Sequence, residues 1–475
     1  MNRSIRRVSV VAAFMFLALL VNITLGYFVR DPGLLQDPNN QRVLQQQFDQ
    51  PRGAILVGNT PIVSTQASDG RFQYQRVYAA GPMYSAVTGY YSFVYGRSKL
   101  EQTYNQQLTG QDGSGLTAKI LGSLTDKPPV GSNVQTTLNA KAQQAAWDGL
   151  AGRKGAAVAV DYTTGAILAY VSSPGFDPAP LASADMGAEQ AAWKADTADP
   201  NDPMADRAGQ EIYPPGSTFK LVTAAAALQN GWQTSQLMDA PATLTLPGTN
   251  VQLPNDTPCG GAQITMEQAL DVSCNTAFAN LGLSLGQEKL AAQAKAFGFG
   301  TSFGGDIDSA KSVFPSDLNQ SQLAMSAIGQ YDVAATPLQM AMVAAAIANG
   351  GTEMTPYLVS EVRAPDLSII DQHVPTPYGQ PINQVTAATL QDLMVSVVAK
   401  GTGTQAQVQG VRVGGKSGTA QSDPSRPDYA WFTGFADNPH VAICVFVEDA
   451  EIAPSEIGGS RVAGPIFRQI LTALQ

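Results

Sequence analysis

The sequence predicts an α+β protein, in which a large domain of antiparallel sheet flanked by helices follows a small N-terminal domain and one transmembrane helix. An almost charge-free stretch covers residues 8–29, a segment rich in Gln, Gly, Tyr and Ser follows it, and helical and strand patterns alternate from residue 134 onward. A chain of 475 residues is too long for one ordinary core. Its content of 44% hydrophobic and 14% charged residues is typical of a well-packed globular protein.

Residues 1–30 are predicted to form a cytoplasmic tip and a membrane anchor. Arg3, Arg6 and Arg7 precede the apolar stretch, and about twenty apolar residues suffice to span a bilayer. Arginines on the N-terminal flank favour keeping that end in the cytoplasm. We therefore expect a single-pass, type II protein of the cell membrane with its bulk outside the cytoplasm. A cleaved signal peptide is the alternative, which the length of the stretch and the lack of an A-x-A-like site disfavour.

Residues 31–132 are predicted to form the small domain, with short strands at 54–57 and 61–63. Residues 133–475 carry the longer patterns. Helices are expected at 140–151, 221–228, 340–348 and 462–474, and strands at 156–161, 166–171, 411–413, 430–432 and 441–447. Thr163-Thr164-Gly165 predicts a tight turn between the first two strands. Helices packed on an antiparallel sheet are the expected layered arrangement.

Composition and spacing disfavour several functional classes. The formal net charge of −10 argues against nucleic acid as a partner. The chain has no C-x-x-C and no close histidine pair, so we expect no metal site and no cofactor. His373 and His440 are expected to be exposed turn residues, and no G-x-S-x-G surrounds a serine, which disfavours a histidine-based hydrolase.

Gly410 with Gly415-Lys416-Ser417 formally satisfies the phosphate-binding loop pattern G-x-x-x-x-G-K-[ST]. Residues 411–413 alternate like a strand inside the supposed loop, and two prolines in 423–427 stand where a helix would have to follow. A phosphate-binding loop needs a strand before it and a helix after it, so nucleotide binding is disfavoured.

Ser217 and Lys220 lie at the head of an apolar helical pattern, directly after a Pro-Pro-Gly segment. Side chains at i and i+3 share a helix face, so the Lys220 amine can reach the Ser217 hydroxyl and serve as its base. The first turn of a helix also favours negative charge on the serine oxygen. An N-cap serine followed by a surface lysine is the alternative, and this spacing alone does not separate the two.

Two later motifs favour the catalytic interpretation. Ser273-Cys274-Asn275 and Lys416-Ser417-Gly418-Thr419 complete the order S-x-x-K, S-x-N, K-[ST]-G, which resembles the penicillin-recognising serine acyltransferases. Further similar segments are Arg207-Ala208, Gly329-Gln330, 336–339, 349–351 and 431–435, so the resemblance covers nearly all of the chain from residue 134. In the small domain, 52–55, Gly96, 100–104 and Leu108 resemble structural motifs of class B penicillin-binding proteins. One departure is Asp206, where this family often has Asn.

The chain thus resembles a class B penicillin-binding protein of the actinobacterial penicillin-binding protein A type. The resemblance implies a penicillin-binding transpeptidase domain, similar to serine β-lactamases, over 133–475, and a pedestal domain over 31–132. It implies a D,D-transpeptidase that forms an acyl-enzyme with the D-Ala-D-Ala end of a peptidoglycan stem peptide and transfers it to a neighbouring amine. β-Lactams would acylate the same serine.

The resemblance also implies a role for each motif residue. Ser217 would attack, Lys220 would be its base, and the backbone N–H groups of Ser217 and Thr419 would form the oxyanion hole. Ser273 would relay a proton and Asn275 would hold the substrate amide. The terminal carboxylate would be bound by Lys416, Ser417, Gly418 and Thr419. A neutral Lys220 requires desolvation and the nearby second cation, both of which lower its pKa.

The expected partners are stem peptides, β-lactams, the membrane, a membrane-embedded glycan polymerase of the SEDS family, and other proteins of division or elongation. The sequence does not distinguish division from elongation. A D,D-carboxypeptidase or β-lactamase would use the same motifs with water as acceptor. A β-lactam sensor and a cell-wall scaffold are the non-enzymatic alternatives.

Three cysteines remain to be placed. Cys444 lies in a continuous apolar strand pattern and is expected to be a buried free thiol. Cys259 and Cys274 are candidates for a disulfide, since bridges are permitted outside the cytoplasm, and such a bridge would hold the S-x-N segment. Two unpaired cysteines are the open alternative.

Overall fold

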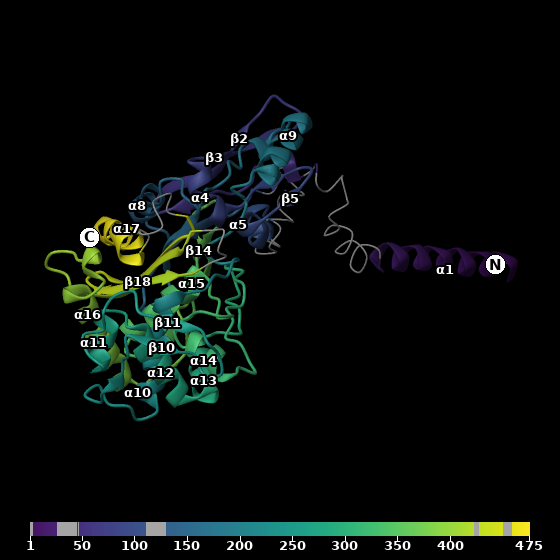
Figure 1. Cartoon of the computed structure of the whole chain (residues 1–475). Coiled ribbons are helices and arrows are strands. Elements are labelled where there is room, and N and C mark those ends of the chain that lie inside the picture. Colours follow the sequence, from purple (N-terminus) through teal and green to yellow (C-terminus); the bar gives the residue numbers. More distant parts are fainter. Residues whose placement is uncertain (1–2, 26–44, 46, 111–129, 422–426, 450–457) are drawn as a thin grey trace.

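The computed structural model describes residues 3–25, 45, 47–110, 130–421, 427–449 and 458–475 (Figure 1). The N-terminal helix α1 (Arg3–Leu25) stands apart from the body in Figure 1, with its apolar side chains exposed. By length and composition, its segment Ile5–Leu25 can cross a membrane. The described helix reaches Leu25, and residues 26–29 of the predicted apolar stretch lie outside the described part of the chain.

The small domain is built on a six-stranded sheet of order β15-β14-β6-β1-β2-β3. Its elements are β1 (Ile55–Val57), β2 (Thr60–Ala67), β3 (Tyr74–Tyr78), α4 (Gly81–Thr88), β4 (Tyr91–Ser92), β5 (Gly96–Arg97), α5 (Lys99–Thr103), α6 (Asn105–Leu108) and β6 (Asn133–Thr136). The hairpin β14 (Val359–Arg363) and β15 (Ile369–Gln372) comes from far along the chain and completes this sheet. The pairing gives β6 a partner on its second edge, which would otherwise present unpaired backbone groups. The sheet therefore joins the two predicted domains, whose boundary at 132/133 stays a prediction.

A buried ion cluster fixes the interior of the pedestal. The carboxylate of Glu101 accepts hydrogen bonds at 2.6 Å from both Arg52 Nε and Arg76 Nε, and all three side chains are almost fully buried. Burial acts to raise the pKa of Glu101, but the two arginine charges outweigh it and hold that pKa below its usual value. The motif residues around 52 and 101 therefore have structural roles, as their resemblance implies.

The pedestal and the large domain are also joined by an ion pair. Lys99 Nζ lies 2.5 Å from the Asp206 carboxylate, which also accepts from the Tyr170 hydroxyl. This contact gives a physical reason for Asp206, because an asparagine at the same place would leave the lysine without a counter-charge.

The large domain has a central antiparallel sheet of order β17-β18-β19-β7-β8. Its strands are β7 (Gly155–Val160), β8 (Ile167–Ser173), β17 (Val413–Ala420), β18 (Tyr429–Asp437) and β19 (His440–Val447). Helices α8 (Ala140–Leu150) and α17 (Gly459–Ala473) pack on one face, and α15 (Pro337–Ala348) packs on the other. The predicted layered arrangement is confirmed.

The remaining elements of the large domain surround this sheet. They are η2 (Pro180–Ala182), α9 (Met186–Ala198), η3 (Gly216–Phe219), α10 (Lys220–Gln229), β9 (Met238–Asp239), β10 (Thr243–Thr245), β11 (Gln252–Pro254), β12 (Gln263–Ile264), α11 (Met266–Asp271), α12 (Asn275–Leu285), α13 (Gln287–Ala296), α14 (Gln320–Ser326), β13 (Glu353–Met354), β16 (Pro377–Gly379), α16 (Gln384–Lys400) and η4 (Thr404–Ala406). Helices α10 to α14 gather at the end of the body away from β2, β3 and α9, with β18 between the two groups (Figure 1).

Three details differ from the sequence predictions. The strand expected at 411–413 begins only at Val413 and continues to Ala420, because the whole Gly-Gly-Lys-Ser-Gly-Thr segment pairs with β18. His373 is half-buried, and its ring stacks on Tyr357 with the centroids 3.7 Å apart. His440 is exposed as expected but begins β19, where its Nδ1 lies 2.7 Å from the Tyr162 hydroxyl.

Candidate active site

Ser217 lies in a 3₁₀ turn, η3, and not in the first turn of an α-helix as predicted; α10 begins only at Lys220. In a 3₁₀ turn the side chains at i and i+3 are eclipsed, so Lys220 still follows Ser217 on one face. Gly216 permits this geometry with φ +51°, a left-handed conformation that favours glycine. A Cβ atom built on Gly216 would lie 2.6 Å from the carbonyl oxygen of Thr419, so the turn that holds Ser217 packs backbone to backbone against β17.

The strand β17 is an edge strand of the sheet and carries the second half of the site. Gly418 also lacks room for a Cβ, which would approach Pro215 O at 2.9 Å and Thr218 N at 3.2 Å. Because of these contacts, the segments that carry the backbone N–H groups of Ser217 and Thr419 lie next to each other. The arrangement is suited to an oxyanion hole, and the outer edge of β17 can pair with an extended peptide.

Ser273 sits in the turn between α11 and α12, where it adopts φ +60°. A left-handed conformation is uncommon for a residue with a side chain and marks a turn that its surroundings hold in place. The turn places the Ser273 hydroxyl between two lysine amines. Lys416 Nζ lies 2.9 Å from Ser273 Oγ, and Lys220 Nζ lies 3.3 Å from the same oxygen. The three predicted motifs therefore meet at one hydroxyl.

The amine of Lys220 makes two short contacts besides this one, at 2.7 Å to Ser273 O and at 2.7 Å to Asn275 Oδ1. Both are obligatory acceptors. A neutral amine has two N–H groups and one lone pair, so these two oxygens use both protons and the lone pair is left for a hydroxyl. Among the described residues, no hydrogen bond joins Lys220 Nζ to Ser217 Oγ; the S-x-N turn orients the amine instead.

Electrostatics favour that neutral form. Lys220 is fully buried, and burial first, with the Lys416 charge second, lowers its pKa well below the usual value. Burial lowers the pKa of Lys416 to about 7, against the opposing effect of the Asp256 and Asp271 carboxylates. Burial therefore favours the neutral form of Lys220 and gives Lys416 a pKa of about 7, well below the usual lysine value.

Lys416 and Ser417 make two further polar contacts. Lys416 Nζ donates to Ser417 O at 2.9 Å. The Ser417 hydroxyl donates to Thr402 Oγ1 at 2.9 Å, in the turn that follows α16. Sequence reasoning missed Thr402, because it lies outside the motif segments and only the tertiary fold brings it to Ser417.

The S-x-N turn, residues 273–275, is bonded to the loop that follows β11. Cys259 and Cys274 form a disulfide, and Asn275 Nδ2 donates to Pro254 O at 3.3 Å. Asn255 Oδ1 accepts from the backbone N–H of residue 276 at 2.9 Å. The free cysteine, Cys444, is buried in β19.

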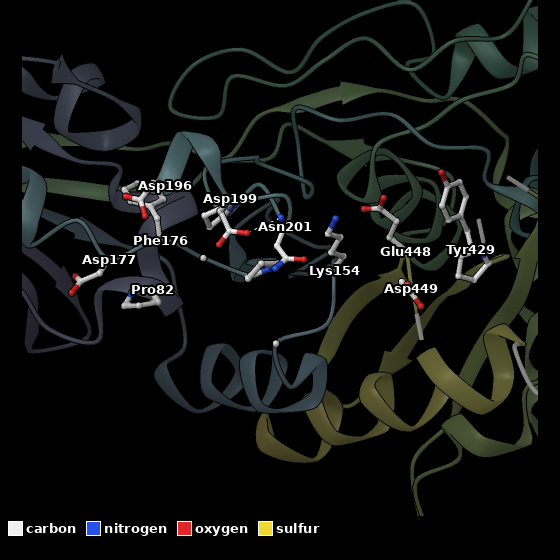
Figure 2. Close-up of a pocket in the computed structure, with 15 residues that line it drawn as sticks. Pro82, Lys154, Phe176, Asp177, Asp196, Asp199, Asn201, Tyr429, Glu448 and Asp449 are labelled. Carbon is white, nitrogen blue, oxygen red and sulfur yellow. Dashed lines mark hydrogen bonds between the residues drawn. The ribbon is translucent and has the colours of Figure 1, made fainter. Parts of the chain in front are cut away.

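A cleft of about 650 Å³ lies elsewhere on the molecule (Figure 2). Asp196, Asp199 and Lys154 line one part of it, and Glu448 and Tyr429 line another. Its lining contains none of the motif residues. In the described ranges, no group of three His, Cys, Asp or Glu side chains could hold a metal ion.

Comparisons with known proteins show the family to which the chain is similar. The family model described as the penicillin binding protein transpeptidase domain matches residues 155–472, and that of the penicillin binding protein A dimerisation domain matches 52–134. The chain is 41% identical to the peptidoglycan D,D-transpeptidase PbpA of Mycolicibacterium smegmatis, over 100% of this chain and 99% of the relative. It is 39% identical to the Mycobacterium tuberculosis protein of the same name, with the same two shares covered.

A solved structure is similar over most of the chain. It is the ceftriaxone acyl-enzyme complex of penicillin-binding protein A from M. tuberculosis, with a TM-score of 0.87 and 37% identity. The similarity covers 90% of this chain and 99% of that one.

Proposed function

This chain belongs to the penicillin-binding protein transpeptidase family and is a peptidoglycan D,D-transpeptidase that β-lactams acylate, and we propose that Ser217 is the nucleophile of both reactions. The observation that carries the assignment is the Ser273 hydroxyl, which contacts both lysine amines beside the turn that holds Ser217. A hydroxyl, a neutral amine and a second cation in one buried cluster are the groups that acyl transfer requires.

Acylation begins when Ser217 Oγ attacks the carbonyl carbon of the penultimate D-Ala of the donor peptide. The hydroxyl proton passes to the lone pair of Lys220 Nζ, and the carbonyl oxygen becomes an oxyanion bound by the N–H groups of Ser217 and Thr419. Fixed donors of this kind are worth roughly 10²–10³ in rate each. The pKa of Lys220, which lies well below the usual lysine value, supports its role as the base, since burial opposes protonation.

Collapse of the tetrahedral intermediate breaks the peptide bond and leaves an ester on Ser217. The leaving nitrogen needs a proton, which Lys220 supplies through the Ser273 hydroxyl; Ser273 is held by Lys416 on its other side. D-Ala departs as a free amino acid. The amine of a neighbouring stem then attacks the ester, its proton returns to Ser217, and the new amide is the cross-link.

Substrate binding follows from the edge position of β17. An extended donor peptide can pair with the strand, while the amide of Asn275 holds the peptide from the opposite side of the groove. Lys416, Ser417 and Thr419, with the glycine backbone at 418, bind the terminal carboxylate. A protonated lysine supplies charge there and the hydroxyls supply direction.

The catalytic domain is placed outside the cytoplasm, with α1 as the anchor. Arg3, Arg6 and Arg7 at its N-terminal end support this orientation, as does the disulfide between Cys259 and Cys274. Protease added to wall-stripped intact cells should digest the catalytic domain, and full protection would contradict the orientation.

The partner that supplies nascent strands is a SEDS-family glycan polymerase, which should copurify from solubilised membranes. Its absence from such preparations would count against the pairing.

The product distribution tests the function. Full-length protein is incubated with a stem peptide ending in D-Ala-D-Ala and a second stem that carries a free amine. Cross-linked dimer with one D-Ala released per link is the expected product, and Ser217→Ala should abolish it. Release of D-Ala without dimer would indicate a carboxypeptidase. Full activity in Ser217→Ala would refute the nucleophile assignment.

A further inference from the structure

The proposed function fixes the direction in which a donor peptide runs along β17. Its terminal carboxylate lies at Lys416 and Ser417, and its reacting carbonyl lies at the backbone N–H of Thr419. The strand runs from the first of these positions towards its end at Ala420, so the residues upstream of the carbonyl leave the groove past that end. A strand rises about 3.3 Å per residue, which places the residue before the acylated D-Ala close to Gln421.

Asp428 lies beside this exit. Tyr429, the first residue of β18, pairs with Ala420, so Asp428 stands next to the position that follows the end of β17. The Asp428 side chain is half-buried, and among the described residues no hydrogen bond or ion pair engages its carboxylate. This carboxylate is therefore partly desolvated beside the path of the donor and lacks a counter-charge.

Asp256 approaches the same place from the opposite wall of the groove. It follows two residues that hold the S-x-N turn, since Pro254 O accepts from Asn275 Nδ2 at 3.3 Å and Asn255 Oδ1 accepts from the N–H of residue 276 at 2.9 Å. Asp256 is exposed, and within the described ranges its carboxylate likewise has no hydrogen bond or ion pair. Each wall of the groove thus carries one unpaired carboxylate.

The charge of Asp256 reaches both sides of the groove. It opposes the burial that lowers the pKa of Lys416, and it is the second cause, after burial, that raises the pKa of Asp428. Two carboxylates that repel each other are stabilised by a cation placed between them. The amines of Lys220 and Lys416 do not fill that role, because both are buried and hydrogen-bonded around Ser273.

The donor peptide supplies such a cation. The cross-link forms through a free amine of a neighbouring stem, and donor and acceptor stems belong to the same polymer, so the donor carries the same amine. Since the donor ends in D-Ala-D-Ala, its amine lies upstream of the acylated residue, on the part that leaves past Ala420. The acceptor amine comes from the other direction, because it replaces the leaving nitrogen on the side of Ser273 and Lys416.

We propose that Asp256 and Asp428 are specificity-determining residues that bind the protonated amine of the donor stem, upstream of its D-Ala-D-Ala end. The inference rests on the proposed function, which gives the direction of the donor. The ammonium group donates hydrogen bonds to one carboxylate from each wall, and such charge-assisted bonds are stronger than neutral ones. A protonated amine has no lone pair, so the donor's own amine is kept from attacking the ester.

The test compares two donor peptides, Nα-acetyl-L-lysyl-D-Ala-D-Ala with its free side-chain amine and the same peptide with that amine acetylated. The value of kcat/KM for D-Ala release is measured on full-length wild-type protein, Asp256→Asn, Asp428→Asn and the double variant, because this constant reports acylation and not the later transfer. Wild-type protein should favour the free amine by roughly 5- to 50-fold, between the values for exposed and buried charged hydrogen bonds. Each single change should reduce this preference, and the double variant should lose it to within about twofold.

The two peptides carry the same terminal carboxylate and are compared on one sample, so neither a smaller folded fraction nor a changed charge on Lys416 alters the ratio. Asp148→Asn removes an exposed carboxylate on α8 and is the control for net charge, which should keep the wild-type preference. Equal rates for the two peptides on wild-type protein would overturn the inference, and so would an undiminished preference in the double variant.

Two other outcomes separate this inference from its alternatives. If the variants kept the donor preference and changed only the dependence on the acceptor amine, the inference would be overturned in favour of acceptor binding. Failure of the proposed function would look different, because Ser217→Ala would then still release D-Ala from both peptides.

Discussion

The acylation rate should fall steeply when the pH rises above 7, because Lys416, which we propose binds the carboxylate, loses its charge. Burial lowers the pKa of Lys416 to about 7. At pH 7 about half of the Lys416 side chains are protonated, and at pH 9 only about 1% are, so the rate with a carboxylate-bearing penicillin should drop by roughly 50-fold over these two units. Lys220 does not compensate, since burial and the Lys416 charge lower its pKa well below the usual value and favour its neutral amine.

The assay is the second-order rate constant for labelling with a fluorescent penicillin between pH 6 and pH 10, because this constant reports the free enzyme. The methyl ester of the penicillin, which has no carboxylate for Lys416 to bind, should show a much shallower alkaline limb. A flat profile up to pH 9 with the free acid would refute the reasoning. A rate that rises towards pH 10 would show that the base titrates with an ordinary lysine pKa.

A measurement of stability distinguishes the predicted loss of acylation at high pH from a loss caused by unfolding. The folded pKa of Lys416 is lowered from 10.5, so the unfolded state binds more protons between pH 7 and 10.5. The contribution of this group to the free energy of unfolding therefore rises with pH over that window. Acylation should decline while this contribution to stability grows, and a thermal melt at each pH checks that the protein is still folded.

Three further outcomes are expected. Glu101→Gln should reduce the free energy of unfolding by roughly 3–5 kcal/mol, because two buried arginines lose their counter-charge, and chemical denaturation measures it. Gly216→Ala should lower the acylation rate by roughly 10²–10³-fold, because the new Cβ would lie 2.6 Å from Thr419 O and displace the oxyanion hole. Replacing Cys259 and Cys274 by serine should cost about 3 kcal/mol of stability, since the bridge spans 15 residues, and should slow acylation because the S-x-N turn is freed.

Matched variants separate these effects from general damage. Gly304→Ala is the control for the glycine, since a Cβ there meets nothing within 4 Å. An acylation rate in Gly216→Ala equal to that of this control would contradict the role of close packing. Glu361→Gln is the control for the carboxylate, because Glu361 forms an ion pair with an arginine at 2.7 Å that is about one-third exposed. Equal losses from the two glutamates would contradict the importance of burial.

The parts of the candidate site that the sequence predicts are those that form short motifs. Ser217, Lys220, Ser273, Asn275 and Lys416 were placed by spacing and resemblance, and the structure brings the lysines and Ser273 into direct contact. The layered sheet followed from apolar strand patterns with period two and from the helical patterns around them.

The remaining features depend on tertiary contacts that local sequence does not encode. The left-handed conformation of Ser273 has no local signal, because it depends on the two helices that meet there. Thr402 reaches Ser417 only because Gly401 lets its turn approach Asp271. The β14–β15 hairpin joins a sheet more than two hundred residues away along the chain, and glycine-rich β17 has low intrinsic strand propensity that pairing with β18 overrides.

Peptide mapping of the penicillin adduct tests the central claim most directly, namely that the three motifs form one acylation site. Full-length protein is labelled, digested and analysed by mass spectrometry, beside Ser217→Ala and Lys220→Ala. The account predicts one adduct, on Ser217, absent from the first variant and formed far more slowly in the second. An adduct on any other residue, or undiminished labelling of Lys220→Ala, would contradict it.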